Sequence, residues 1–195
     1  MRQSVYQRKT GETNIAVSIN LDGTGKCHAD TGIGFFNHML TLFAKHGYFD
    51  LEIACKGDLD VDGHHTVEDA GIVLGTAIGE ALGNKAGICR YGSFTVPMDE
   101  SLAVVHLDLS GRPYLVFQCD YTGPACGEFD VQLTEEFFRG LAFAAGVTLH
   151  IQVPYGKNDH HKIEGVFKAF ARALDAATRM DGRTMEIPST KGTLA

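Results

Sequence analysis

One short motif of potential metal ligands occurs twice in this chain. It reads His-His-x-x-Glu and is found at His64-His65-x-x-Glu68 and at His160-His161-x-x-Glu164. On an α-helix, residues four positions apart share a face, so the first histidine and the glutamate of each motif can converge on one point. The second histidine projects about 100° away from the first. Imidazole nitrogen together with carboxylate oxygen suits Mn, Fe, Zn or Ni. Each motif therefore predicts ligands in two directions, able to bridge two metals or two subunits.

The motif has two other interpretations. Zinc peptidases carry His-Glu-x-x-His, in which the glutamate lies between the histidines as general base. The residue order here is different, so a peptidase is disfavoured. Either motif alone would more often be a pair of exposed or helix-capping histidines. Two copies at matched positions of an internal repeat favour the metal-ligand interpretation instead.

The repeat extends beyond the histidine motifs. Residues 12–23 align with 100–111, and both segments read as strands that end at a glycine turn. Residues 37–53 align with 135–151, and both read as a helix followed by a strand. Each motif then begins a second helix, whose apolar stripe we expect at Val67, Ala70, Leu74, Ile78 and Ala81 in the first half and at Phe167, Phe170, Ala171 and Leu174 in the second. Gly47 is expected to end the first of these helices as its C′ residue.

This order predicts an α+β fold of two pseudo-symmetric half-domains, each a sheet packed on two helices. We expect half-repeats at 1–90 and 91–185, packed as one compact unit, followed by a C-terminal tail over 186–195. The repeat also pairs His38 with Glu136, which adds one candidate ligand to each half. Grouped by half, the candidates are His38, His64, His65 and Glu68, and Glu136, His160, His161 and Glu164. Eight ligands suit two metal ions.

Composition narrows the class of protein. The chain has 195 residues and a net charge of −7, which disfavours a general nucleic-acid binder because such binding needs a basic surface. No apolar run approaches the roughly 18–20 residues of a membrane span, and the N-terminus lacks the apolar region of a secretory signal. The five cysteines are odd in number and form no Cys-x-x-Cys, which fits a reducing compartment in which the thiols act as small core residues. We expect a cytoplasmic protein with no membrane or nucleic-acid partner.

Several runs together identify a family. They lie at residues 31–40, 63–69, 90–92, 108–113, 158–165, 167–173 and 189–192. In these runs the chain closely resembles imidazoleglycerol-phosphate dehydratases, which act in histidine biosynthesis. The resemblance covers essentially the whole chain, and the combination of motifs is highly specific.

The resemblance implies a fold, an assembly and a metal. The half-domains would be of the ribosomal protein S5 domain 2-like kind, in a particle of 24 subunits. Two Mn²⁺ ions per subunit would lie at subunit interfaces. The implied metal ligands are His38, His64, His65, Glu68, His160, His161 and Glu164. Several members of the family have a histidine as the remaining ligand, where this chain has Glu136, which can still ligate through oxygen.

The resemblance also implies contacts to a small phosphorylated substrate. Outside the metal ligands these are Glu12, His46, Arg90, Arg112, Lys168, Ser189, Thr190, Lys191 and Gly192. Among the ligands, substrate contacts are implied at His38, His64, His65, Glu68, His160 and His161. The carboxylates with an implied catalytic role are Glu12, Glu68 and Glu164.

The implied reaction converts D-erythro-imidazoleglycerol phosphate to imidazole-acetol phosphate by loss of water. The proton that is lost is not next to a carbonyl, so the imidazole ring must supply the electrons that expel the hydroxyl. A metal on a ring nitrogen favours the imidazolate, which leads to a diazafulvene-like intermediate. A base must then take a proton from the next carbon. Glu12 is the first candidate, although it could be an exposed strand-end carboxylate, and Glu100 and Asp99 are weaker candidates.

A phosphate group would need fixed positive charge in this acidic chain. Arg90, Arg112 and Lys191 can supply it, and Ser189, Thr190 and the backbone near Gly192 add hydrogen-bond donors. These residues separate the enzyme from its main rival, a non-enzymatic metal-binding or storage assembly, which needs no phosphate site. A di-metal phosphoesterase is a second rival, but such sites are mostly built from carboxylates around a shared water.

Overall fold

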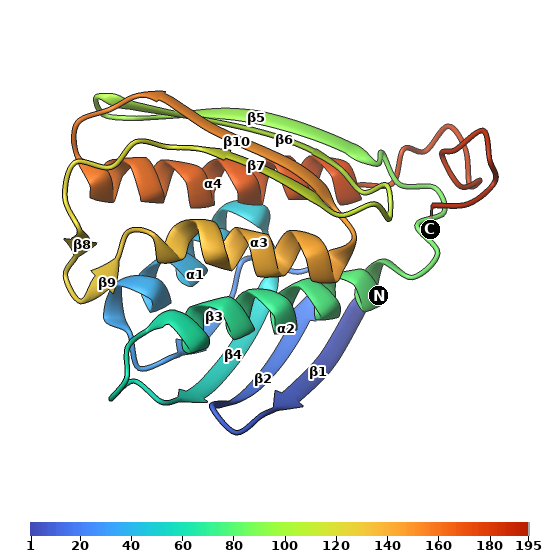
Figure 1. The fold of residues 1–195 in the computed structure, drawn as a ribbon. Helices are drawn as coiled ribbons and strands as arrows, with labels where there is room; N and C mark the ends of the chain where they lie inside the picture. Colours follow the sequence, from blue (N-terminus) through green and yellow to red (C-terminus); the bar gives the residue numbers. More distant parts are fainter. Residues whose placement is uncertain (195) are drawn as a thin grey trace.

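The computed structural model describes residues 1–194, so Ala195, the last residue of the predicted tail, lies outside the described residues. Two four-stranded sheets form the outer layers of the molecule, and four helices lie between them (Figure 1). This arrangement confirms the predicted α+β fold of two half-domains, each a sheet packed on two helices.

The two half-domains repeat the same order of elements. The first contains β1 (Gln3–Lys9), β2 (Thr13–Asn20), β3 (Cys27–Asp30), α1 (Gly34–Gly47), β4 (Asp50–Gly57) and α2 (His64–Leu82). The second contains β5 (Tyr91–Met98), β6 (Ser101–Asp108), β7 (Tyr114–Gln118), α3 (Leu133–Ala145), β10 (Thr148–Tyr155) and α4 (Asp159–Thr178). A small hairpin, β8 (Ala125–Cys126) with β9 (Phe129–Asp130), is inserted before α3.

Strand order shows the internal symmetry most directly. The sheets run β1-β2-β4-β3 and β5-β6-β10-β7. In each sheet the last strand pairs parallel to its neighbour, while the other pairs are antiparallel. The boundaries expected at residues 90 and 185 remain predictions, because they fall in connecting segments rather than at a break in the packing.

Alternation along the strands sends one side of each sheet into the core. On β2, Ile15, Val17 and Ile19 are buried while the residues between them are more exposed. Because side chains alternate with a period of two, the buried set faces the helices and the polar set faces outward. The predicted helix stripes are confirmed too, since every member is buried: Val67, Ala70, Leu74, Ile78, Ala81, Phe167, Phe170, Ala171 and Leu174.

The expectation that Gly47 is the C′ residue of α1 was wrong by one position. The left-handed position is Tyr48, with φ 58°, and the matched position after α3 is Gly146, with φ 65°. Gly47 is instead the last helical residue, and a Cβ there would lie 2.4 Å from the Phe49 ring. The packing of that ring, rather than a turn, requires glycine at position 47.

Helices pair across the half-domains, α1 with α4 and α2 with α3. On α2, Gly71 faces the carbonyl of Phe137 and Gly75 faces the carbonyl of Leu141. The second contact lies further along α2 and also further along α3 than the first, so the two helices run parallel. A Cβ at Gly71 would lie 2.3 Å from that carbonyl oxygen, which explains why glycine is needed where the backbones approach.

Two expectations from composition can be compared with the structure. All five cysteines are free and only partly buried, so they are less enclosed than core residues. Within the described part of the chain, no helix combines the length and apolar character needed to cross a membrane.

The close approach of α2 and α3 generates a stability prediction. We expect Gly71→Ala to lower the free energy of unfolding by about 1–3 kcal/mol, because the added methyl overpacks a backbone contact. Gly79→Ala is the matched control, since its Cβ would lie 3.8 Å from the nearest atom of α3. That substitution should be neutral or stabilising by up to about 1 kcal/mol through helix propensity. Denaturant unfolding of both variants measures the difference, and equal stabilities would contradict it.

Candidate metal centres and substrate site

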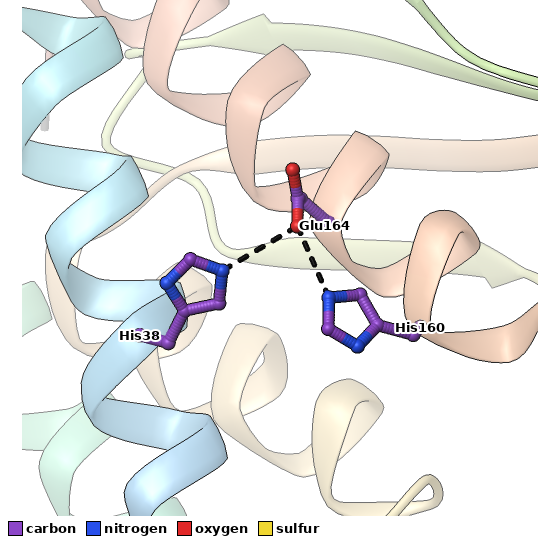
Figure 2. Close-up of side chains that lie close together, drawn as sticks. All are labelled: His38, His160 and Glu164. Carbon is purple, nitrogen blue, oxygen red and sulfur yellow. Dashed lines mark hydrogen bonds and ion pairs between the residues drawn. The ribbon is translucent and has the colours of Figure 1, made fainter.

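The first cluster of potential metal ligands joins the two half-domains. His38 on α1 lies with its Nε2 3.4 Å from Oε2 of Glu164 on α4, and Nε2 of His160 lies 3.2 Å from the same oxygen. Figure 2 shows both rings pointing toward that carboxylate from two different helices. One donor atom of each residue lies within 4.8 Å of the others.

The second cluster is the symmetry mate of the first. It consists of His64 and Glu68 on α2 and Glu136 on α3, again with donor atoms within 4.8 Å of one another. Nε2 of His64 lies 3.8 Å from Oε2 of Glu68, as expected for residues one helical turn apart. We call these two clusters the first triad and the second triad.

The triads correct the grouping of ligands by half-domain. His38 belongs with the motif of the second half, and Glu136 belongs with the motif of the first half. The cause is the helix pairing, because α1 packs on α4 and α2 packs on α3. Each triad therefore needs both halves of the repeat.

Local caps hold the beginning of each motif helix in place. The Asp62 carboxylate accepts a hydrogen bond from the backbone N–H of His64 at 2.7 Å. The Asn158 side chain accepts from the backbone N–H of His160 at 3.0 Å and of His161 at 3.4 Å. Such caps satisfy helix N–H groups that have no intrahelical partner, so they fix where each motif starts.

The donor sets of the triads fit a divalent cation. The first triad offers two imidazole nitrogens and a carboxylate, and the second offers one imidazole and two carboxylates. Nitrogen and oxygen donors of this kind suit Mn²⁺, Fe²⁺ or Zn²⁺. Three protein donors leave coordination positions open for further ligands.

A basic residue accompanies each triad. Nζ of Lys168 lies 2.6 Å from Oε1 of Glu164, and Nε of Arg139 lies 3.3 Å from Oε2 of Glu136. Burial alone would raise the pKa of Glu164, but its hydrogen bond and ion pair with Lys168 outweigh burial and lower it. Lys168, for which the resemblance implies a substrate contact, thus lies beside the candidate metal ligands.

The second histidines of the motifs, His65 and His161, lie outside both triads. Nδ1 of His65 is 3.0 Å from Oδ2 of Asp58, and Nδ1 of His161 is 2.8 Å from Oε2 of Glu100. These carboxylates raise the pKa of both histidines, chiefly by hydrogen bonding. The prediction that the second histidine projects away from the first is therefore confirmed for each motif.

Glu12 and Glu100 are repeat partners with different surroundings. Glu12 lies in the turn between β1 and β2, its side chain is 57% exposed, and its nearest charged partner is Nε2 of His65 at 3.7 Å. Glu100 accepts hydrogen bonds from His161 and from the backbone N–H groups of Lys157 and Asn158, which hold its pKa far below the usual range. Glu100 is therefore the poorer proton acceptor of the two.

Most of the predicted phosphate-binding residues line one pocket of about 670 Å³, namely Arg90, Arg112, Ser189, Thr190 and Lys191. Gly192 lies next to this set, where its N–H donates to the Ser189 carbonyl in a turn.

The two arginines of this pocket differ in how available their charge is to a ligand. Arg90 donates two hydrogen bonds to Asp108, at 2.7 and 3.1 Å, and one to the Pro188 carbonyl at 2.7 Å. These hydrogen bonds occupy the guanidinium of Arg90 and hold the tail at Pro188. Arg112 is 63% exposed and 3.9 Å from Asp108, so its charge is available to a ligand.

The pocket and the triads lie at opposite ends of the folded subunit. The motif histidines begin α2 and α4 at one end, while the tail lies beyond the C-terminal ends of these helices (Figure 1). The tail hydrogen-bonds to Gly87, just past α2, so the length of a 19-residue helix, about 28 Å, separates it from His64. His46, near the end of α1, has a pKa lowered by burial and by Lys168 and Arg172. One chain therefore does not bring all the predicted residues together.

Some residues beside the candidate site were not named as site residues from the sequence. Asp58 follows β4 outside every motif, and only the fold places it beside His65. Lys162 is buried and forms a 2.8 Å ion pair with Asp159, which also accepts hydrogen bonds from Thr122 and Gly123. This pair fastens the loop before β8 to the start of α4.

Comparison with known proteins identifies a family for this chain. The family model described as imidazoleglycerol-phosphate dehydratase matches residues 31–174. The imidazoleglycerol-phosphate dehydratase of Acetivibrio thermocellus is 60% identical over 193 residues, covering 99% of each chain.

Two solved structures share the fold over nearly their whole length. The enzyme of Staphylococcus aureus has a TM-score of 0.82 and 44% identity, covering 90% of this chain and 99% of its own. That of Pyrococcus furiosus, solved in complex with (S)-C348, has a TM-score of 0.82 and 36% identity, covering 96% and 99%. The chain therefore belongs to the imidazoleglycerol-phosphate dehydratase family of hydro-lyases.

Proposed function

We propose that this chain catalyses the metal-dependent loss of water from D-erythro-imidazoleglycerol phosphate, giving imidazole-acetol phosphate, in the cytoplasm. The observation that carries this proposal is the pair of symmetry-related triads, each with three nitrogen or oxygen donors within 4.8 Å of one another. A substrate imidazole has two ring nitrogens, and two triads offer one metal site for each.

Two Mn²⁺ ions per subunit are the proposed cofactors. His38, His160 and Glu164 would hold one ion, and His64, Glu68 and Glu136 the other. Bound there, the ions favour the deprotonated form of the substrate ring, as cations favour anionic ligands. The ligation of Mn²⁺ by Glu136 through oxygen is chemically sound, because carboxylates are preferred ligands of this ion.

Glu12 is the proposed base. It takes the proton from the carbon adjacent to the one that bears the departing hydroxyl. It lies outside both triads, beside His65, and most of its side chain is accessible. A carboxylate without several hydrogen-bond donors keeps its lone pairs available for a proton. Glu100 and Asp99 are weaker candidates, and the hydrogen bonds to Glu100 support that order.

The tail pocket is the proposed phosphate site. Arg112 and Lys191 supply charge, with Ser189 and Thr190 as neutral donors, and Arg90 fixes the position of the tail through Pro188. An arginine can donate two parallel hydrogen bonds to phosphate oxygens.

Self-assembly would complete the active site. The phosphate pocket and the triads lie at opposite ends of a chain, so a substrate that uses both must lie between two chains. His65 and His161, which face away from the triads of their own chain, are suited to be ligands across such an interface. We propose metal sites at subunit interfaces on this basis, and the 24-subunit particle because the family resemblance implies it.

Two alternatives are less well supported. A metal-storage assembly would use the triads but has no need of a pocket lined by Arg112, Ser189 and Lys191. A di-metal phosphoesterase would hold both ions in one shared site. Here the two triads lie on different helix pairs, which favours separate ions.

Metal removal tests the cofactor and the assembly together. Chelation should abolish dehydration of imidazoleglycerol phosphate and shift a large particle toward small oligomers, because metal binding stabilises only the assembled state. Returning Mn²⁺ should restore both. Activity and light scattering on the same samples measure this, and full activity in a verified metal-free sample would overturn the metal dependence.

Glu12→Gln tests the base. The amide keeps the shape of the side chain and removes its basicity, so kcat should fall by roughly 10²–10⁴ while metal content and particle size stay normal. Glu52→Gln, on the exposed face of β4, is the control and should keep full activity. A loss confined to KM would assign Glu12 to substrate binding instead.

Arg112→Ala tests the phosphate pocket. We expect KM to rise strongly with metal content unchanged, because the substitution removes phosphate binding and leaves the triads intact. Arg183→Ala removes an 85% exposed arginine that lies just before the tail, and it should leave the kinetics as they are. Steady-state kinetics at saturating Mn²⁺ distinguish the two, and an unchanged KM for the Arg112 variant would refute this role.

A further inference from the structure

We propose that Asp58 and Glu100 are positioning residues, which orient the rings of His65 and His161 so that each presents Nε2 to a metal held by a second copy of this chain. This inference rests on the proposed metal-dependent function. It assigns a task to two carboxylates that lie outside both triads and outside the histidine motifs.

The contact to His65 is made by both oxygens of one carboxylate. Nδ1 of His65 lies 3.0 Å from Oδ2 and 3.2 Å from Oδ1 of Asp58. Asp58 directly follows β4, and its side chain is 25% exposed. The ring is therefore held from the side of the sheet, and its Nε2 lies toward the exposed carboxylate of Glu12 at 3.7 Å.

The contact to His161 is made by a carboxylate that is itself fixed. Oε2 of Glu100 lies 2.8 Å from Nδ1 of His161, while Oε1 accepts the backbone N–H groups of Lys157 at 3.0 Å and Asn158 at 2.7 Å. Nε2 of His161 again lies outward, 3.7 Å from the exposed Asp99. The two histidines are thus held in the same way, by Nδ1.

The two carboxylates are not equivalent in the repeat. Glu100 lies in the β5–β6 hairpin, and its repeat partner is Glu12, which approaches the Nε2 side of His65 instead. Asp58, at the end of β4, supplies the Nδ1 contact in the first half-domain. The same contact therefore arises from two different positions, so duplication alone does not account for it.

A carboxylate at Nδ1 prepares a histidine to ligate a metal. When Nδ1–H donates to the carboxylate, the tautomer is fixed and the lone pair lies on Nε2. In the first triad His38 and His160 also direct Nε2 toward the shared carboxylate of Glu164. Among residues 1–194, neither His65 nor His161 belongs to a metal-ligating cluster of its own chain. In the proposed assembly, a metal ion held by a triad of a second copy would accept the Nε2 lone pair.

The test is the affinity of the full-length protein for Mn²⁺. Asp58→Asn, Glu100→Gln and the double variant are stripped of metal and titrated with Mn²⁺, with the free ion followed by its electron paramagnetic resonance signal. We expect Mn²⁺ binding to weaken about 10–100-fold in each single variant. The glutamine at position 100 keeps an oxygen for Lys157 and Asn158, so the backbone contacts can persist. Asp60→Asn removes an exposed carboxylate from the same loop as Asp58 and should bind Mn²⁺ as the unmodified protein does.

Thermal unfolding of the metal-free variants separates positioning from stability. A positioning role leaves that midpoint unchanged while Mn²⁺ affinity falls. A lowered midpoint in the metal-free state would assign the two carboxylates a structural role and overturn the inference. Unchanged Mn²⁺ affinity in both single variants would also overturn it, and would leave the proposed function standing. If the unmodified protein bound no Mn²⁺, the proposed function itself would fail.

Discussion

The close parallel packing of helices from opposite half-domains is the constraint on which the site depends. Gly71 and Gly75 allow the backbone of α2 to approach that of α3, and α1 lies on α4 by the same pseudo-symmetry. Since the paired helices run in the same direction, their N-terminal turns lie at the same end of each pair. Those turns carry the potential metal ligands, so the pairing creates both triads at once. A helix shifted by one turn would separate His38 from Glu164 by about 5.4 Å more along the axis.

Sequence reasoning was strongest where the information is local or repeated. The period of the apolar residues predicted the helix stripes, and the repeated motif predicted the direction of His65 and His161. The partner of each helix is not encoded in any period, so His38 and Glu136 were assigned to the wrong motifs. Asp58 was missed because a single acid after a strand resembles any exposed loop residue. Tyr48 was missed as the cap because the requirement for glycine at 47 comes from the Phe49 ring.

Duplication has left two triads that share a plan and differ in charge. The first combines two histidines with one carboxylate and has Lys168 beside it. The second combines one histidine with two carboxylates and has Arg139 beside it. Under the proposed function, the additional negative charge of Glu136 would favour a hard cation at the second triad, because carboxylate oxygen suits such ions more than imidazole does. Equivalent positions in the fold therefore do not imply equal metal affinity.

The separation of Arg112 from the triads has a genetic consequence under the proposed assembly. A chain that has lost Arg112 still offers intact triads, and a chain that has lost His160 still offers an intact phosphate pocket. In a particle built from both kinds of subunit, some interfaces bring one undamaged end against another. Two inactive versions of the gene, expressed in one cell, would then partly complement each other, which a site contained within a single chain does not allow.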